Sequence, residues 1–241
     1  VTGVRRVLFR SALVVAPAGA VAAALAAPYV AVTVALAIIG LRRVLARAAP
    51  PSRLAVALGL LFLPAAATWL LAACAGYALL GYPSLWVLLT AAHFHVAGAY
   101  LPLVAGRVAH GRGRVAAALA LAPSLSVPLT AAGIVGPAWL ERLAAPITAA
   151  IGFTLGALAV AGVAPPALGR AARRTLRAAG VVLLVTMPLA AAFALRDHTL
   201  ARWLGLDPLA AMVVAHGAPN ALAALLALAA VARAPAPDAL R

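Results

Sequence analysis

The stretch AVALGLLFLPAAATWLLAACAGYAL, residues 55–79, decides the fold class, because it contains no charged side chain. A helix needs about 20 mostly apolar residues to cross the hydrocarbon core of a bilayer. Residues 208–232 form a second run of the same kind. The strands of a membrane barrel would instead alternate polar and apolar residues. Continuous apolar runs therefore predict membrane-spanning α-helices.

The composition extends this prediction to the whole chain. Of its 241 residues, 66% are hydrophobic and 10% are charged, and the mean hydropathy is +1.10. Soluble domains are about a quarter charged, and a soluble fold of this size could not bury so much apolar surface. In lipid, only helices and closed barrels satisfy every backbone polar group. We therefore predict an all-α, polytopic transmembrane helix bundle whose main partner is the lipid bilayer.

Eight apolar segments can be drawn, which predicts about eight spans. They are residues 11–27, 29–41, 54–79, 84–106, 115–136, 146–164, 178–195 and 208–232. Pro28 alone separates the short second segment from the first, so this pair is expected to form a tight hairpin or a re-entrant element. The first segment also resembles a signal peptide, but we expect it to remain as a span. Residues 1–233 are expected to form one domain without an internal repeat, followed by a disordered tail at 234–241.

Arginine sets the expected orientation. The net charge of +15 comes from Arg alone, since the chain has no Lys. The arginines cluster at residues 5–10, 42–53, 107–114 and 170–177, whereas the intervening loops are neutral. The positive-inside rule then places both termini in the cytoplasm, in a bacterial-type cytoplasmic membrane. The same rule accounts for the basic charge without a nucleic-acid partner, and the single Cys74 leaves no disulfide framework.

Four polar residues are expected deep in the membrane: His93, His95, His216 and Asn220. His93 and His216 each lie about nine residues from the outer face, or roughly 13 Å deep. Asn220 follows His216 by one helical turn on the same face. Polar side chains at this depth normally face the interior of a bundle. We therefore predict one shared polar site.

The spacing limits the chemistry of that site. His93 and His95 point to nearly opposite sides of a regular helix, so one of them is expected to face His216 and the other a neighbouring helix. No carboxylate lies within a span, which argues against a metal, and no cofactor motif is present. Thr90, Trp69 and Tyr100 are possible cavity-lining residues.

Several polar side chains outside this set are expected to have local roles. Tyr29 is expected near a membrane interface as an aromatic anchor. Ser124, Ser126 and Thr130 are expected to hydrogen-bond the backbone of their own helix.

Two motifs resemble those of the YndJ-like family of membrane proteins. Residues 91–103, AAHFHVAGAYLPL, resemble the family's HFHYAGF-type signature, with Val96 and Ala99 in place of Tyr and Phe. Residues 216–221, HGAPNA, resemble its HGxxNA pattern. The resemblance covers the chain from about the third span onward. Family members are sometimes labelled transporters, so the resemblance implies a membrane protein without naming an activity.

Three functions are compatible with these observations. The first is transport of a small lipophilic or polar ligand through the histidine site, with histidine protonation as a coupling step. The second is a membrane-embedded enzyme of the isomerase or terpenoid cyclase type, with a histidine as general acid or base. The third is a structural subunit without chemistry, in which helix contacts satisfy both histidines.

Overall fold

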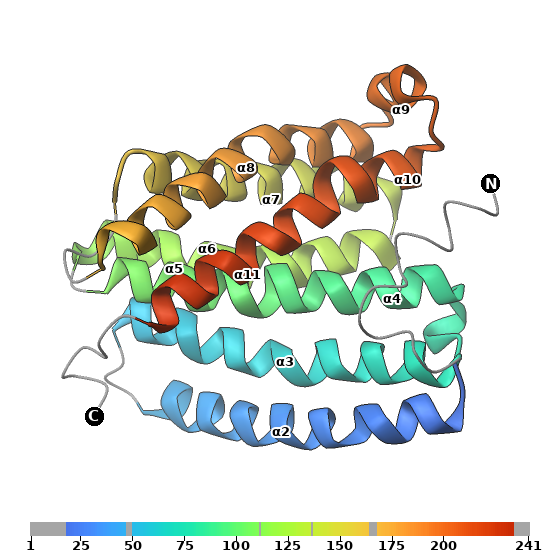
Figure 1. The fold of residues 1–241 in the computed structure, drawn as a ribbon, viewed down its shortest axis with the longest axis horizontal. Coiled ribbons are helices and arrows are strands. Elements are labelled where there is room, and N and C mark those ends of the chain that lie inside the picture. The colour runs from blue at the N-terminus through green and yellow to red at the C-terminus, as the bar shows by residue number, and fades with distance from the viewer. Residues whose placement is uncertain (1–17, 47–49, 111, 136, 164–167, 234–241) are drawn as a thin grey trace.

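The computed structural model describes residues 18–46, 50–110, 112–135, 137–163 and 168–233. Within these ranges all regular structure is helical, which confirms the all-α prediction. Seven helices are long and apolar enough to cross a membrane, and they run side by side as a bundle (Figure 1). Five are formed by α2 (Ala20–Leu45), α3 (Pro51–Ala75), α6 (Gly113–Val135), α7 (Ala138–Val160) and α8 (Arg170–Ala194). The other two spans, residues 84–109 and 208–232, are each built from three consecutive segments.

The expected turn at Pro28 is wrong. Pro28 lies inside α2, which continues without a break from Ala20 to Leu45. A turn at this depth would expose several unpaired backbone groups to lipid, whereas a proline within a helix removes a single hydrogen bond. The N–H of Gly19 donates to the carbonyl of Cys74 at 2.8 Å, which joins the start of α2 to the end of α3. The expected cytoplasmic N-terminus and residues 11–17 of the first expected span lie outside the described residues.

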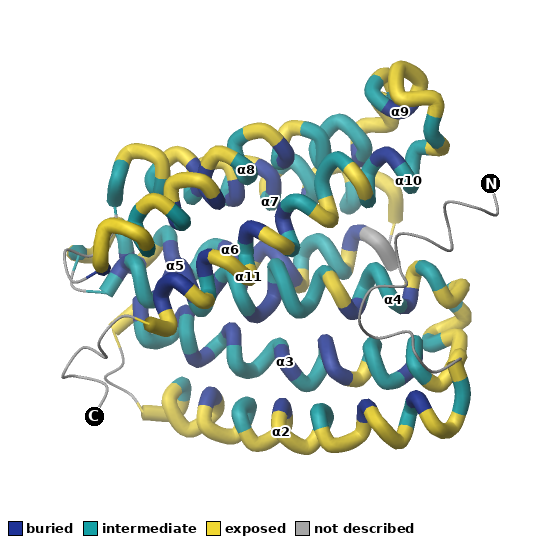
Figure 2. The backbone as a smooth tube through the Cα atoms, in the orientation of Figure 1, coloured by how far each residue is buried: buried dark blue, intermediate teal, exposed yellow. Residues whose placement is uncertain are grey.

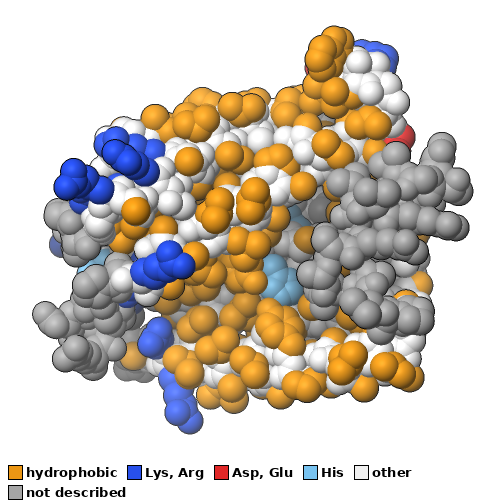
Figure 3. Space-filling model, viewed as in Figure 1, with side chains coloured by type: hydrophobic (Ala, Val, Ile, Leu, Met, Phe, Trp, Pro, Cys, Tyr) orange, Lys and Arg blue, Asp and Glu red, His pale blue; other side chains and the backbone are white. Residues whose placement is uncertain are grey.

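The predicted arginine asymmetry is confirmed for the described part of the chain. One end of the bundle carries nearly all the blue side chains in Figure 3. These arginines are Arg42, Arg43, Arg53, Arg107, Arg112, Arg114, Arg170, Arg173, Arg174, Arg177 and Arg233. The opposite end combines three arginines with three carboxylates, and one pair, Arg196–Glu141, is in contact at 3.4 Å. We call these the arginine end and the neutral end.

Two helices begin earlier than expected, because the expected spans excluded charged residues. Glu141 and Arg142 were expected in a loop but lie in the first turns of α7. The arginines of residues 170–177 likewise form the start of α8. Long arginine side chains can extend from a helix end toward water, so charge at a boundary did not mark the end of a helix. The last expected span, residues 208–232, has the same bounds in the structure.

The spans form two groups of three with the same order of elements. The N-terminal group contains α2, α3 and the span of α4 (Ser84–His93), η2 (Phe94–Tyr100) and α5 (Leu101–Ala109). The C-terminal group contains α7, α8 and the span of α10 (Pro208–Met212), η3 (Val213–Gly217) and α11 (Ala218–Ala232). Helix α6 connects the groups, so corresponding helices run in the same direction (Figure 1). The order of elements therefore repeats, although no repeat was evident in the sequence.

Packing within the groups also matches. In each group the first helix packs against the second, and the second packs against the interrupted third. Small residues allow the first two helices to approach closely in both cases. A Cβ at Gly40 would lie 2.6 Å from the carbonyl oxygen of Ala57, and one at Gly156 would lie 2.8 Å from that of Gly180. The groups meet where α11 packs against η2 and α5.

The buried residues are mostly small and lie along the inner faces of the helices (Figure 2). Exposed leucines, valines and isoleucines cover the outer faces, most continuously on α2. A soluble protein rarely exposes so much apolar surface, whereas lipid would cover it. The architecture is therefore that of a helical membrane protein.

The short helix α9 (Thr199–Leu204) lies at the neutral end, between α8 and α10. Asp197 accepts a hydrogen bond from the backbone N–H of Thr199 at 3.0 Å. Hydrogen bonds from the Thr199 hydroxyl and backbone lower the pKa of this carboxyl below its usual range. In the same element Trp203 is 81% exposed, which suits a residue at a membrane interface.

Candidate functional site

The third and last spans are interrupted by the π-helical segments η2 and η3. A proline ring clashes with the carbonyl four residues earlier, and Pro102 and Pro219 place this clash at Gly98 and Ala215, inside the two segments. Proline alone does not explain these π-helical segments, because Pro64 lies in an uninterrupted α-helix. In both interrupted spans a glycine precedes the proline by at most four residues, which occurs in no other described span. π-Helical segments are frequent at functional sites.

His216, in η3, is held by polar groups of α8 and α11. Its Nδ1 lies 2.9 Å from the backbone carbonyl oxygen of Thr186 and 3.0 Å from the side-chain amide of Asn220. Asn220 in turn contacts the Thr186 hydroxyl at 2.8 Å. Thr186 and Asn220 are buried, at 4% and 6% exposure. The network fixes His216 through one ring nitrogen. Sequence reasoning missed Thr186, because nothing local to the seventh expected span indicated a partner on the eighth.

His93 is the last residue of α4. Its Nε2 is buried and has no hydrogen-bond partner among the described residues. Helix α11, which directly follows the segment that contains His216, packs against η2, which directly follows His93. A buried polar atom without a partner is costly, which makes it a candidate contact for a bound molecule.

His95 has a different environment. Its Nδ1–H donates to the carbonyl of Ala91 at 2.8 Å, and its Nε2 accepts a 2.6 Å hydrogen bond from the hydroxyl of Tyr29 on α2. Because a carbonyl can only accept, these contacts determine which ring nitrogen carries the proton. Tyr29 thus lies within the bundle and is not an anchor at a membrane interface. His95 joins two helices, and both of its ring nitrogens are satisfied.

Ring contacts describe the surroundings of two of the three proposed cavity-lining residues. The ring of Trp69 lies 6.3 Å from that of Tyr82, toward the neutral end. The ring of Tyr100 lies 6.1 Å from that of His95, and Thr90 is half-buried on α4. Tyr100 therefore lies beside the Tyr29–His95 contact, and Trp69 lies beside Tyr82.

Two of the three polar residues of α6 hydrogen-bond the backbone of their own helix, as expected. Ser126 donates to the carbonyl of Pro123 at 3.0 Å, and Thr130 donates to that of Ser126 at 2.9 Å. Ser124 was expected to do the same, but its hydroxyl is buried without a partner among the described residues. Helix α6 packs against η2, so this hydroxyl is a further polar atom in the same layer of the bundle.

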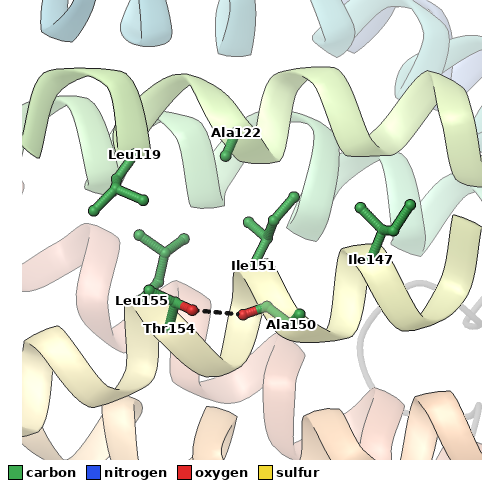
Figure 4. Close-up of a pocket in the computed structure, with 7 residues that line it drawn as sticks. All are labelled: Leu119, Ala122, Ile147, Ala150, Ile151, Thr154 and Leu155. Carbon is green, nitrogen blue, oxygen red and sulfur yellow. Dashed lines mark hydrogen bonds between the residues drawn. The ribbon is translucent and has the colours of Figure 1, made fainter. Parts of the chain in front are cut away.

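A separate cavity of about 270 Å³ lies between α6 and α7 (Figure 4). Its lining residues are Leu119, Ala122, Ile147, Ala150, Ile151, Thr154 and Leu155. The Thr154 hydroxyl donates to the carbonyl of Ala150 at 2.8 Å, so the single polar side chain is already paired. An apolar groove between two spans is suited to a lipid chain. Across the described ranges, no three histidine, cysteine or acidic side chains are grouped as metal ligands.

The comparison with known families agrees with the motifs in the sequence. A family model described as "YndJ-like protein" matches residues 7–224. The chain belongs to the YndJ-like family. The matched region includes both π-helical segments and the residues His93, His95, His216 and Asn220. No curated protein and no solved structure matches the chain, so the family match gives membership without an activity.

Proposed function

We propose that this YndJ-like protein is a transporter of small uncharged molecules, in a bacterial cytoplasmic membrane with its arginine end in the cytoplasm. The observation that carries this proposal is the position of the two π-helical segments. Each interrupts the third helix of its three-helix group near mid-membrane, and His216 lies in one while His93 directly precedes the other. Interrupted helices in corresponding positions of two repeats are where transporters bind their substrates.

Proline in every span supports a bundle that changes shape. All seven candidate spans contain at least one proline within the helix or directly after a π-helical segment. Each proline removes a helical hydrogen bond and lets the helix bend there. A rigid structural subunit has no need of a possible hinge in each helix. Rocking of one three-helix group against the other would expose the histidine site to each side in turn.

The charge distribution supports an uncharged substrate. The described carboxylates, Glu141, Asp197 and Asp207, lie at the neutral end, and the described arginines lie at the two ends of the bundle. No charged side chain of the described spans is therefore placed to compensate a charge at mid-membrane, where an ion would be costly. Among the described residues, the site also lacks an acidic side chain for proton or cation coupling. We infer that the molecule moves down its own concentration gradient.

A purely structural role makes a different prediction, namely that helix contacts satisfy both histidines of the third span. His95 meets this prediction through Tyr29 and Ala91. His93 does not, because its Nε2 is buried without a partner in the described part of the chain. His93 is thus the residue that favours transport over a structural role.

A proteoliposome swelling assay tests the proposal. Purified protein is reconstituted and exposed to inward gradients of glycerol, erythritol or urea, and the swelling rate is followed by light scattering. We expect at least one solute to enter faster than it enters protein-free vesicles. His93→Leu and His216→Leu should abolish this increase.

Tyr29→Phe is the matched control, because it changes the neighbouring histidine contact and leaves the site intact. Chromatography of each variant in detergent verifies that it remains folded. Swelling at the protein-free rate for every solute would overturn the proposal, as would an increase that persists in both histidine variants.

A further inference from the structure

The hydrogen bonds around His216 cannot all form with the amide of Asn220 oriented as it stands. The single hydroxyl proton of Thr186 would be needed by both the Val182 carbonyl and Asn220 Oδ1, each 2.8 Å away. His216 Nδ1 faces a carbonyl oxygen, which only accepts, and Asn220 Nδ2, which only donates. One nitrogen cannot donate to the first and accept from the second at the same time.

Rotation of the Asn220 amide by a half-turn resolves every conflict. Oδ1 then accepts from His216 Nδ1–H, which it shares with the Thr186 carbonyl as a three-centre bond. Nδ2 donates to the Thr186 hydroxyl, and that hydroxyl donates to the Val182 carbonyl. The four contacts keep their distances and are formed by three protons, of which the His216 proton is shared between two acceptors. Asparagine oxygen and nitrogen are assigned by this kind of hydrogen-bond reasoning.

This arrangement fixes the tautomer of His216. With its proton on Nδ1, a neutral imidazole has an unprotonated Nε2 that can only accept a hydrogen bond. The neutral form is expected because the described carboxylates are confined to the neutral end of the bundle. Nε2 points away from Thr186, and no described group hydrogen-bonds to it. His216 therefore presents a fixed hydrogen-bond acceptor to the site.

We propose that the site binds an uncharged molecule through a hydroxyl group, which donates to His216 Nε2 and accepts from His93 Nε2–H. A hydroxyl group can do both at once, so one ligand oxygen would satisfy the buried Nε2 of His93 and the Nε2 of His216. Ethers, ketones and esters can only accept and would leave the His216 lone pair without a partner. An unmet hydrogen bond of this kind discriminates strongly against a ligand in a buried site. This substrate class rests on the proposed transport function, but the tautomer does not.

The tautomer is tested without any transport measurement. Nitrogen NMR of histidine-labelled protein in nanodiscs distinguishes protonated from unprotonated ring nitrogens, and the His216 signals are identified by their loss in His216→Gln. We expect a proton on Nδ1 and none on Nε2. A His216 with its proton on Nε2, or on both nitrogens at neutral pH, would overturn the inference even if the protein transports solutes.

The ligand class is tested with isomers that differ only in the hydroxyl group. Butanediol is compared with dimethoxyethane, and octanol with methoxyheptane, by following the His216 Nε2 signal during titration. We expect at least one alcohol to shift this signal saturably, its ether isomer to leave it unchanged, and His93→Leu to weaken the response at least tenfold. An ether that shifts the signal as its isomer does, or no response to either alcohol, would refute the hydroxyl assignment. Normal transport alongside such a failure would leave the proposed function standing.

Discussion

The contact between Tyr29 and His95 offers a quantitative test of how α2 is held. Tyr29→Phe removes the hydroxyl that donates to His95 Nε2 at 2.6 Å and retains the stacking of the two rings, whose centroids are 5.7 Å apart. Hydrogen bonds between membrane helices average about 0.6 kcal/mol and reach about 1.7 kcal/mol. Since the bond is short and the variant leaves a half-buried nitrogen unpaired, we expect a loss of about 1 kcal/mol, or roughly fivefold in the unfolding equilibrium.

A double-mutant cycle isolates this energy. Tyr29→Phe, His95→Phe and the double variant are unfolded reversibly in mixed micelles, and their unfolding free energies are compared with that of the wild type. We expect a coupling of about 0.6–1.7 kcal/mol, because either single variant already loses the bond. If the two single-variant changes in unfolding free energy sum to that of the double variant within about 0.3 kcal/mol, the role assigned to this pair is refuted. His93→Phe combined with Tyr29→Phe is the control and should be additive.

Three further predictions concern packing, acidity and orientation. Gly156→Leu should destabilise the protein by at least about 1–3 kcal/mol, because its side chain would meet the backbone of α8, whereas Gly169→Ala, with open space around it, should be nearly neutral in the same unfolding assay. The pKa of Asp197 is lowered on folding, so its carboxylate stabilises the α9 turn above the usual aspartate range, and this contribution is lost as the pH falls through the lowered pKa. The protection of the turn amides against hydrogen exchange, taken relative to the intrinsic exchange rate at each pH, should fall over that interval, and Asp197→Asn should remove this pH dependence. With the native cysteine replaced, Arg174→Cys should react with an impermeant maleimide only from the cytoplasmic side and Arg202→Cys only from outside; labelling of both from one side would contradict the topology.

Much of the architecture was predictable because it depends on local sequence. An apolar run of sufficient length must be helical in lipid, so the spans after α2 were placed within a few residues, except where charged residues extend a helix. The positive-inside rule similarly needed only the spacing of the arginines. The turn at Pro28 failed because proline is a helix breaker in water, where a broken helix can hydrogen-bond to solvent. Lipid offers no such partner, so α2 continues through it.

The sequence by itself determined that His93, His95, His216 and Asn220 lie deep in a helical bundle, and that the two histidines of the third span serve different neighbours. Which histidine faces which neighbour was decided by the tertiary structure. Tyr29 reaches His95 from a helix more than sixty residues away, and Thr186 reaches His216 and Asn220 from another. Such contacts depend on how helices pack, and small residues such as Gly156 and Gly180 set that packing through distances between backbones. Hydropathy and charge describe each span separately, so they give the depth of a side chain but not its partner.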